Sequence, residues 1–327
     1  MSEGPVQRDR AAPEPARGVD RPSGRRRGDR VVGAGRATQE AVDQAVAVAR
    51  SDRPVLLLGP QGSGKEHLAR AIHGWSSRRT SPFVVVSCTA VSEALLAREI
   101  MGCSESAHPS LPEEYAGGLA RAAGGTLLID AIDRLPGAVH AAVMKALADG
   151  RFSREGDGVS QPLRARVMAT ALESSGRMLF DELPHHAIHL TALADRREDI
   201  LPLATHFLRI HAEEEGLRPI GFTSDARQAL VEETWTGNVR ELSERVRQAI
   251  RLAGDGAITA EALVLSAEGE DVPSFKEAKR AFETRYVRGL LRRCGGNISR
   301  AARLAKKDRK DFYDVIRRTG VDPSEFR

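Results

Sequence analysis

The stretch VLLLGPQGSGK, residues 55–65, is an apolar run followed by a glycine-rich loop and a lysine. Glycines let a tight loop point successive backbone N–H groups at phosphate oxygens, and the helix that follows presents its positive N-terminal end. The apolar residues of segment 66–73 fall on one helical face. A strand, this loop and a helix together predict a nucleotide-phosphate site, and the alternative is a vestigial loop. Glu66 departs from the general motif, in which a Ser or Thr would meet magnesium.

Length and composition indicate a soluble, multidomain chain. The 327 residues suffice for two or three domains with their own cores. No run of about 18 apolar residues occurs and no secretory signal opens the chain, so we expect a cytoplasmic protein without a membrane partner. The three cysteines are odd in number and lack CxxC spacing, which argues against a disulfide framework and a zinc site and predicts reduced thiols.

The charge is distributed unevenly along the chain. The net charge is +4, with +3 on residues 1–30 and +9 on residues 274–327, which leaves −8 for residues 31–273. Residues 1–30 are rich in Pro, Gly, Arg and Glu, so we predict a disordered basic arm. Its run Arg25-Arg26-Arg27 fits either a nucleic-acid contact or a plain solvated tail. Only the C-terminal segment indicates a polyanion as partner.

The order of apolar patterns predicts an α/β fold with helical additions. Residues 31–195 alternate helices and strands, which is typical of a parallel sheet sandwiched by helices. From residue 196 to 265 the signal is helical only and predicts a lid, a polar linker occupies 266–273, and residues 274–327 form a last helical unit. The predicted elements are helices 38–50, 65–76, 92–100, 137–149, 199–214, 223–233 and 238–253 and strands 55–58, 83–87, 126–130 and 165–170.

Several specific strings occur in one order that resembles the bacterial enhancer-binding proteins, the AAA+ activators that work with sigma-54 RNA polymerase. The resemblance extends from Val31 to the end of the chain. The family also has Glu after the P-loop lysine, so Glu66 fits it. The matching stretches are 59–73, 82–84 with Cys88, 124–127, 196–200 and 235–242.

The resemblance implies an AAA+ P-loop domain with a helical lid that binds ATP or ADP with magnesium. It also implies a homo-oligomer, either a dimer or a ring, and a contact with RNA polymerase or its sigma factor. Asp130 stands at the position of the family's magnesium-associated Asp, and Arg240 at that of the lid arginine of sensor II. The residues expected to bind nucleotide are Gly59, Pro60, Gln61, Gly62, Ser63, Gly64, Lys65, Glu66, Asp130 and Arg240.

The position that carries the family's water-polarising Glu is Ala131 in this chain. A methyl group neither accepts a proton nor orients a water molecule. Asp133, two residues further on, is either a helix cap or a substitute for the missing carboxylate. No residue is therefore assigned a catalytic role.

The other turnover elements of the family are also altered. In the segment 179–183, which resembles the stretch that donates an arginine finger, Glu182 occupies the place of the Arg and reverses its charge. The connection 172–179 looks shorter than the family's, with Arg177 as a weak stand-in for the other finger. Sensor I has Thr170 followed by Ala and Leu, where the family ends on Asn or His.

The expected contact with polymerase differs from the family as well. Residues 106–111, SAHPSL, stand where the family has the string GAFTGA that touches sigma-54, and they lack its Phe-Thr pair. Pro109 stiffens this loop further. We therefore expect direct sigma-54 remodelling to be lost. The resemblance associates members without this string with other polymerase forms or with repression.

Residues 274–327 resemble the Fis-type helix-turn-helix that closes many of these proteins. We expect a helix from Phe275 to Arg293, a glycine stop at 295–296, a first motif helix over 297–304, a turn at 306–308 and a second helix over 309–318 capped by Asp308. The alternative is a basic dimerisation unit. Double-stranded DNA with an inverted repeat is the expected partner. The expected DNA-contacting residues are Lys306, Lys307, Arg309, Lys310, Tyr313, Arg317 and Arg318.

Two further groups invite a functional interpretation. His185, His186 and His189 suggest a metal site, but their alternation with apolar residues predicts an edge strand. Trp235 is expected in the lid core, with stacking on a nucleotide as the alternative.

The leading hypothesis is a DNA-binding transcription regulator that binds ATP or ADP as a conformational or assembly signal and hydrolyses it slowly or not at all. One alternative is a working ATPase that activates sigma-54 polymerase. Another is a non-catalytic subunit that modulates the ring of a paralogue.

Overall fold

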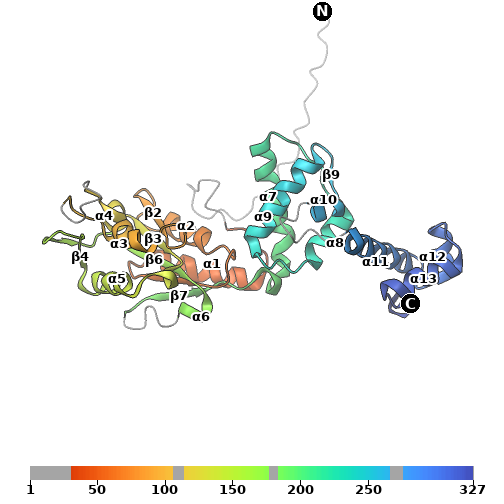
Figure 1. Ribbon diagram of the computed structural model, residues 1–327, viewed down its shortest axis with the longest axis horizontal. Coiled ribbons are helices and arrows are strands. Elements are labelled where there is room, and N and C mark those ends of the chain that lie inside the picture. The colour runs from red at the N-terminus through yellow and green to blue at the C-terminus, as the bar shows by residue number, and fades with distance from the viewer. Residues whose placement is uncertain (1–30, 106–113, 177–182, 266–274, 327) are drawn as a thin grey trace, which may run out of the picture. The chain divides into compact units, whose positions relative to one another are not determined.

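The computed structural model describes residues 31–105, 114–176, 183–265 and 275–326. Within this part the chain forms two compact units, each described below by itself (Figure 1). The first unit contains Ala41–Leu58 and Lys65–His189, and the second contains Val32–Glu40, Gly59–Gly64 and the chain from Leu190 onward.

A five-stranded, fully parallel sheet forms the centre of the first unit, as predicted. Its strand order is β2-β3-β6-β1-β7, which places β1 between β6 and the edge strand β7. All four residues of β1 are buried, because apolar side chains on both faces of a parallel sheet are covered by helices. The strands are β1 (Val55–Leu58), β2 (Phe83–Ser87), β3 (Thr126–Asp130), β6 (Arg166–Ala171) and β7 (His186–His189).

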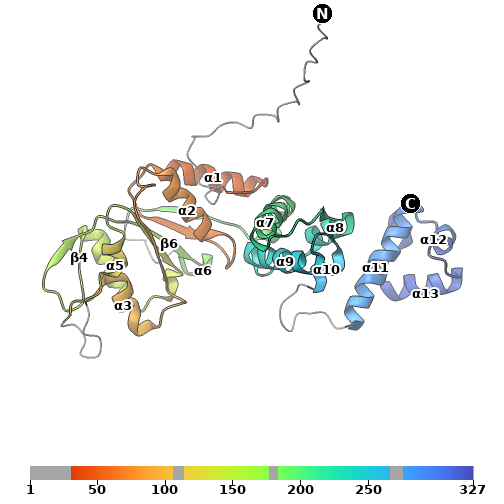
Figure 2. The same cartoon turned by 90° about the horizontal axis from the view of Figure 1, so that it is seen from above.

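Helices cover the two faces of this sheet (Figure 2). Leu56 and Leu127 join a core cluster with residues of α3 and α5, whereas Leu57 and Leu128 point to the other face, where α2 contacts the sheet. The side chains alternate because successive Cβ atoms of a strand point to opposite faces. The helices of this part are α1 (Arg36–Ala49), α2 (Lys65–Trp75), α3 (Glu93–Met101), α4 (Gly117–Arg121), α5 (Gly137–Asp149) and α6 (Glu173–Gly176).

A hairpin follows α5 that the sequence patterns did not predict. Its strands β4 (Arg151–Ser153) and β5 (Ser160–Pro162) pair antiparallel. Cys103 forms isolated bridges to Tyr115 and to Glu155, so the backbone on both sides of residues 106–113 is tied to this hairpin.

The lid has four helices around its own core. Leu203, Leu230, Val246 and Ile250 belong to this cluster. Our prediction that the lid is helical only was wrong in one detail, because two short strands pair in parallel and join the ends of the helical segments. The elements are α7 (Ile200–Glu215), β8 (Gly221–Phe222), α8 (Ser224–Glu232), α9 (Asn238–Ala253), β9 (Ala257–Ile258) and α10 (Ala260–Leu265), preceded by the turns η3 (Leu193–Asp195) and η4 (Arg197–Asp199).

The C-terminal helices α11 (Phe275–Arg293), α12 (Ile298–Leu304) and α13 (Arg309–Thr319) pack on one another around a separate core. Their bounds agree with the predicted helices to within one residue. The predicted linker and arm lie outside the described residues, as do the loop 106–111, Arg177 and Glu182.

Candidate functional site

The glycine-rich loop that follows β1 adopts backbone angles that favour glycine. Gly59 and Gly62 have φ of 145° and 74°. A Cβ atom added to Gly59 would overlap the carbonyl of Leu190, and one added to Gly62 would overlap that of Gly237. Other chain segments therefore approach the loop backbone closely, and only glycine fits at both positions.

The loop is hydrogen-bonded to the first turn of α9. The Gly62 carbonyl accepts the backbone N–H groups of Val239 at 3.0 Å and Arg240 at 3.3 Å. The buried Asn238 donates its amide to the Gln61 carbonyl at 2.9 Å and accepts the Leu193 N–H at 2.8 Å. These bonds connect the phosphate loop directly to the lid. The Arg240 side chain itself is exposed.

A buried polar network holds a second segment against the same loop. Asp199 is fully buried and accepts the N–H groups of Ala34 and Gly35, both at 2.6 Å, and the Thr38 hydroxyl at 2.5 Å. Arg196 donates to Thr38 at 2.9 Å and to the Ser63 carbonyl at 2.7 Å. Burial lowers the pKa of Arg196, and the Asp199 charge opposes this shift.

The phosphate-facing chemistry of the first unit lies at the carboxyl edge of the sheet, where ligands of open α/β sheets bind. Ser87 of β2 and Asp130 of β3 are register partners, and Thr170 lies near the end of β6. The Thr170 hydroxyl donates to Asp130 Oδ1 at 2.6 Å, and Ser87 Oγ lies 3.5 Å from Oδ2. Asp130 is thereby held in one orientation.

Lys65, the first residue of α2, interacts electrostatically with the carboxylates of Asp130 and Asp133. Burial lowers the pKa of Lys65, and the negative charges of Asp130 and Asp133 raise it in opposition. Burial and the same two charges raise the pKa of the neighbouring Cys88 to about 12. Lys65 and the two aspartates therefore lie close enough to interact electrostatically.

Ala131 continues directly from Asp130 with φ of 58°, and its N–H donates to Thr170 Oγ1 at 2.9 Å. Its side chain offers no polar atom to the site. The cap interpretation of Asp133 was wrong, because no side chain caps the short helix η2 (Ile132–Arg134) that contains it. Asp133 Oδ1 is instead buried without a hydrogen-bond partner among the described residues.

Glu66 lies on the exposed side of α2. Its Oε1 accepts from Arg70 Nη2 at 2.7 Å, and both side chains are about half exposed. The structure thus places Glu66 in an ordinary i, i+4 pair, next to the loop in sequence but engaged with Arg70.

The loop in the second unit and the edge of the sheet in the first unit each carry groups that fit part of a nucleotide with magnesium. The loop leaves no room for side chains at its two constrained glycines, and the buried Ser63 hydroxyl has no hydrogen-bond partner among the described residues. Asp130 supplies a carboxylate of the type magnesium prefers, and Lys65 supplies a cation. The sequence placed Asn238 in a string that matches the family and Thr170 in sensor I, but it did not predict their hydrogen bonds to Gln61 and Asp130.

The C-terminal helices present the second candidate site. The Asp308 side chain caps α13 by accepting the Lys310 N–H at 2.8 Å, as predicted. Phe312 and Ile316 are buried, and Arg318 is paired with Glu283 of α11 at 2.7 Å. The predicted contact residues Lys306, Lys307, Arg309, Lys310, Tyr313, Arg317 and Arg318 are all exposed.

The turn before α13 contains a strained residue. Lys306 has φ of 51°, in the left-handed region that favours glycine. Glycine adopts this conformation without the steric penalty that a lysine side chain carries.

The histidines and Trp235 have structural roles. His186 and His189 lie on the edge strand β7, which confirms the strand prediction, and no three potential ligand side chains gather for a metal in the described part of the chain. Trp235 is buried in the lid core and donates to the Leu230 carbonyl at 2.8 Å, which confirms the core interpretation. The Arg245 guanidinium lies 4.8 Å from the centroid of the indole ring.

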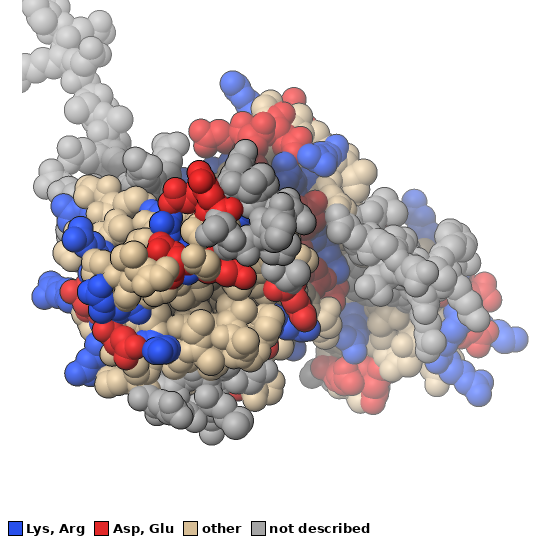
Figure 3. Space-filling model, turned by 60° about the vertical axis from the view of Figure 1, so that its left-hand side comes forward, with Lys and Arg blue, Asp and Glu red and all other residues tan. Residues whose placement is uncertain are grey.

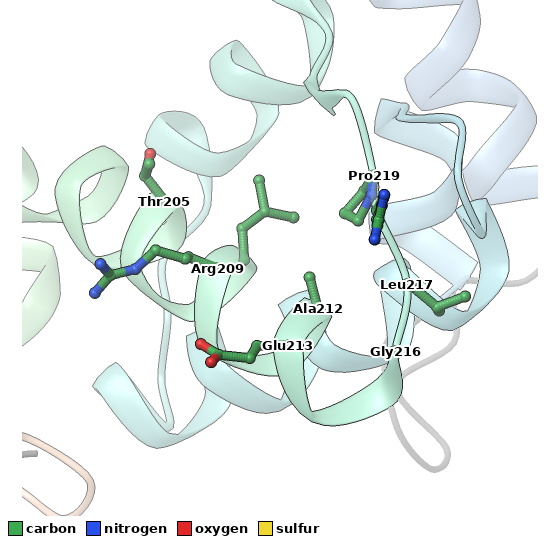
Figure 4. A pocket seen from close by; sticks show the side chains of 9 residues that line it. Thr205, Arg209, Ala212, Glu213, Gly216, Leu217 and Pro219 are labelled. Atoms are coloured by element: carbon green, nitrogen blue, oxygen red, sulfur yellow. The ribbon is translucent and has the colours of Figure 1, made fainter. Parts of the chain in front are cut away.

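A hollow of about 580 Å³ lies on the lid. In Figure 4, α7 contributes Thr205, Arg209, Ala212 and Glu213, and the segment 216–219 forms the other side. None of its lining residues belongs to the phosphate loop or to the first turn of α9.

The face of the first unit seen in Figure 3 carries acidic and basic side chains interspersed among uncharged ones. This mixture agrees with the sequence, in which the basic excess falls outside the α/β part. In the described part of the chain, the helices are too short or too polar to cross a bilayer.

Comparison with known proteins gives consistent matches along the chain. The profile of the Sigma-54 interaction domain matches residues 31–182, and that of the AAA+ ATPase lid domain matches residues 194–279. The chain is 33% identical over 297 residues to the transcriptional regulatory protein GlrR of Escherichia coli (strain K12), which covers 88% of this chain and 67% of that protein. It is 37% identical over 228 residues to the Sigma54-dependent transcriptional activator SfnR of Pseudomonas putida, with coverage of 67% and 62%.

Solved structures match as well. The crystal structure of NtrX from Brucella abortus in complex with ADP aligns with a TM-score of 0.65 at 29% identity, covering 89% of this chain and 70% of that chain. The structure of the same protein in complex with ATP aligns with a TM-score of 0.63, covering 89% and 69%.

Proposed function

Because the chain belongs to the family of sigma-54-dependent AAA+ transcriptional regulators, we propose that it is a DNA-binding regulator that uses ATP or ADP as a signal. In this proposal the nucleotide is bound but turned over slowly or not at all. The single observation that carries the proposal is Ala131, which follows the well-positioned Asp130 and offers only a methyl group.

The binding half of the site supports nucleotide as the ligand. Loop amides within Gly59–Gly64 and the Lys65 ammonium would hold the phosphates, and Asp130, fixed by Thr170, would hold magnesium. Bound magnesium would neutralise part of the phosphate charge. The solved NtrX structures with ADP and with ATP support the same ligands in this proposal.

In this proposal the chain lacks the two groups that ATP hydrolysis needs, a carboxylate that orients water and a cation that stabilises the developing charge. A water molecule beside the γ-phosphate needs a carboxylate to orient it, and a cation to stabilise the developing charge. Ala131 supplies no carboxylate, and Glu182 brings a negative charge where the family has an arginine. The charge reversal raises the barrier because it repels the charge that develops on the phosphate oxygens.

The hydrogen bonds between the loop and α9 offer a route from nucleotide to lid. The Gly62 carbonyl accepts the N–H groups of Val239 and Arg240, so any change in the loop reaches the first turn of α9 through backbone bonds. A nucleotide that binds two lid states with different affinity shifts the population between them. We infer that ATP and ADP select different states of the lid, and thereby of a dimer or ring.

The C-terminal unit supports DNA as the partner. Two helices joined by a tight turn, with exposed basic residues on the second helix, form the geometry that enters a major groove. A homodimer would read an inverted repeat. In this proposal direct remodelling of sigma-54 is lost, because the sequence of residues 106–111 lacks the Phe-Thr pair.

One observation favours a second candidate, a functional ATPase. Asp133 Oδ1 is buried, lacks a hydrogen-bond partner among the described residues and acts electrostatically on Lys65. A carboxylate in that state is available to orient water in place of the missing Glu.

Nucleotide binding and phosphate release, measured on the full chain with and without DNA, test these two candidates. The Lys65→Ala variant sets the background, and Asp133→Asn keeps the shape of the side chain but removes its charge. Tight binding of ATP and ADP with no release above the Lys65→Ala background supports the proposed regulator. Lys65-dependent release that Asp133→Asn abolishes overturns it in favour of the ATPase.

A further inference from the structure

We propose that Asp314 selects a cytosine in the DNA half-site. This inference rests on the proposed DNA binding by α13 and adds a specificity determinant to it. Asp314 is an exposed acidic residue on a helix whose other exposed residues are mostly basic.

The helical period places Asp314 near the middle of the exposed face of α13. Phe312 and Ile316 are buried and Val315 is half-buried, so these residues mark the side packed on the core. Each residue of an α-helix advances by about 100°, which sets Lys310 and Asp314 on the opposite side. A helix that lies in a groove with its core side outward directs these two residues at the base pairs.

The surroundings of Asp314 are positively charged, yet its carboxylate is not paired. Lys310 lies four residues before it, and Arg317 and Arg318 lie three and four residues after it. Arg318 pairs instead with Glu283 of α11 at 2.7 Å. The Asp314 carboxylate forms no hydrogen bond or ion pair with any residue that the structure describes.

An unpaired carboxylate directed at DNA is repelled by the phosphates, so its presence lowers affinity for DNA in general. In the major groove it finds hydrogen-bond donors only on amino groups. Cytosine N4 is the donor that Asp and Glu side chains accept from, whereas guanine and thymine offer acceptors to the groove and repel a carboxylate. Asp314 therefore admits cytosine at one position and disfavours guanine and thymine there.

Asp311 provides a matched control on the same helix. It is also exposed and acidic, and it lies three residues before Asp314, on the flank of the exposed face. Substitution of either residue by Asn removes one negative charge from α13, so the change in net charge is the same. Only the residue that reads a base changes the selected sequence.

The test is selection of binding sites from a pool of random duplexes by the full chain, followed by affinity measurements on the selected duplex. The unaltered chain should enrich a cytosine at one position of each half-site. Asp314→Asn should shift that position toward adenine, to which Asn bonds bidentately, and Asp314→Ala should relax it. Replacing the cytosine should cost the unaltered chain about ten- to a hundred-fold in affinity and Asp314→Ala much less.

The outcomes separate this inference from the function on which it rests. If the unaltered chain enriches no sequence at all, both are overturned. If it enriches a clear site that Asp314→Asn and Asp314→Ala retain unchanged, DNA binding stands and the role of Asp314 is overturned. A shift in Asp311→Asn equal to that in Asp314→Asn overturns it as well, because the effect is then one of charge alone.

Discussion

The Thr170 hydroxyl donates a 2.6 Å hydrogen bond to the Asp130 carboxylate and accepts the Ala131 N–H at 2.9 Å. One side chain of β6 therefore fixes both the proposed magnesium ligand and the residue that follows it. Outer groups of this kind orient metal ligands and tune their affinity. Thr170 of the sensor I segment is thus given a role in the binding half of the site.

Thr170→Val should weaken binding of magnesium-ATP while leaving binding of metal-free nucleotide nearly unchanged. Val has a similar shape but lacks the hydroxyl, and loss of such a metal-orienting hydrogen bond costs about tenfold or more in metal affinity. Titration of ATP with and without magnesium measures the effect, and Thr170→Ser is the control that keeps the hydroxyl. Equal magnesium dependence in the Val and Ser variants would contradict the role given to Thr170.

Ala131→Glu should raise phosphate release above that of the unaltered chain. The substitution returns a carboxylate next to Asp130, and general base groups contribute about 100- to 10,000-fold to such reactions. We expect a gain of about tenfold only, because Glu182 still stands in place of the arginine. Ala131→Gln is the matched control, with the same length and no charge. A rate in the Glu variant no higher than in the Gln variant would show that Ala131 is not what limits turnover.

Local patterns predicted the strands of the central sheet, most of the longer helices and the phosphate loop because each depends on neighbouring residues. The apolar run of β1, the glycines after it and the cap at Asp308 all lie within a few positions of the structure they specify. The parts that sequence reasoning missed depend on distant contacts. Asn238 bonds to Gln61 across 177 positions, and Arg196 bonds to Thr38 across 158. The short elements β8 and β9, of two residues each, are too brief to show a period.

Asp199→Ala should destabilise the second unit by about 3 to 5 kcal/mol, the usual cost of removing one partner from a buried charged network. The change leaves Arg196 as an uncompensated buried cation and removes the acceptor of the Ala34 and Gly35 N–H groups. Urea unfolding followed by Trp235 fluorescence in a Trp75→Phe background reports on this unit. Asp195→Ala, at an exposed position, is the control and should change the free energy of unfolding by less than about 0.5 kcal/mol.

Cys88 should resist alkylation in the native protein. Its pKa is raised to about 12, so the thiolate makes up about one part in ten thousand at pH 8, and the side chain is also buried. Iodoacetamide labelling followed by peptide mass spectrometry measures the rate at Cys88, with the chain unfolded in guanidinium as the reference. The native rate should be at least about a hundredfold lower and should rise with pH. Similar rates in both states would contradict the described burial.

Lys306→Gly should stabilise the C-terminal helices by about 0.5 to 1 kcal/mol. Lys306 has φ of 51°, and a left-handed conformation costs an L-residue about 1 to 2 kcal/mol. Glycine removes this strain but loses more conformational entropy on folding, so only part of the strain energy appears as added stability. Amide hydrogen exchange in α12 and α13 of the full chain measures the local free energy of opening. The neighbouring Lys307→Gly removes the same charge at a residue without positive φ, so it should accelerate exchange or leave it unchanged. Slower exchange in both variants would assign the gain to lost charge and not to relieved backbone strain.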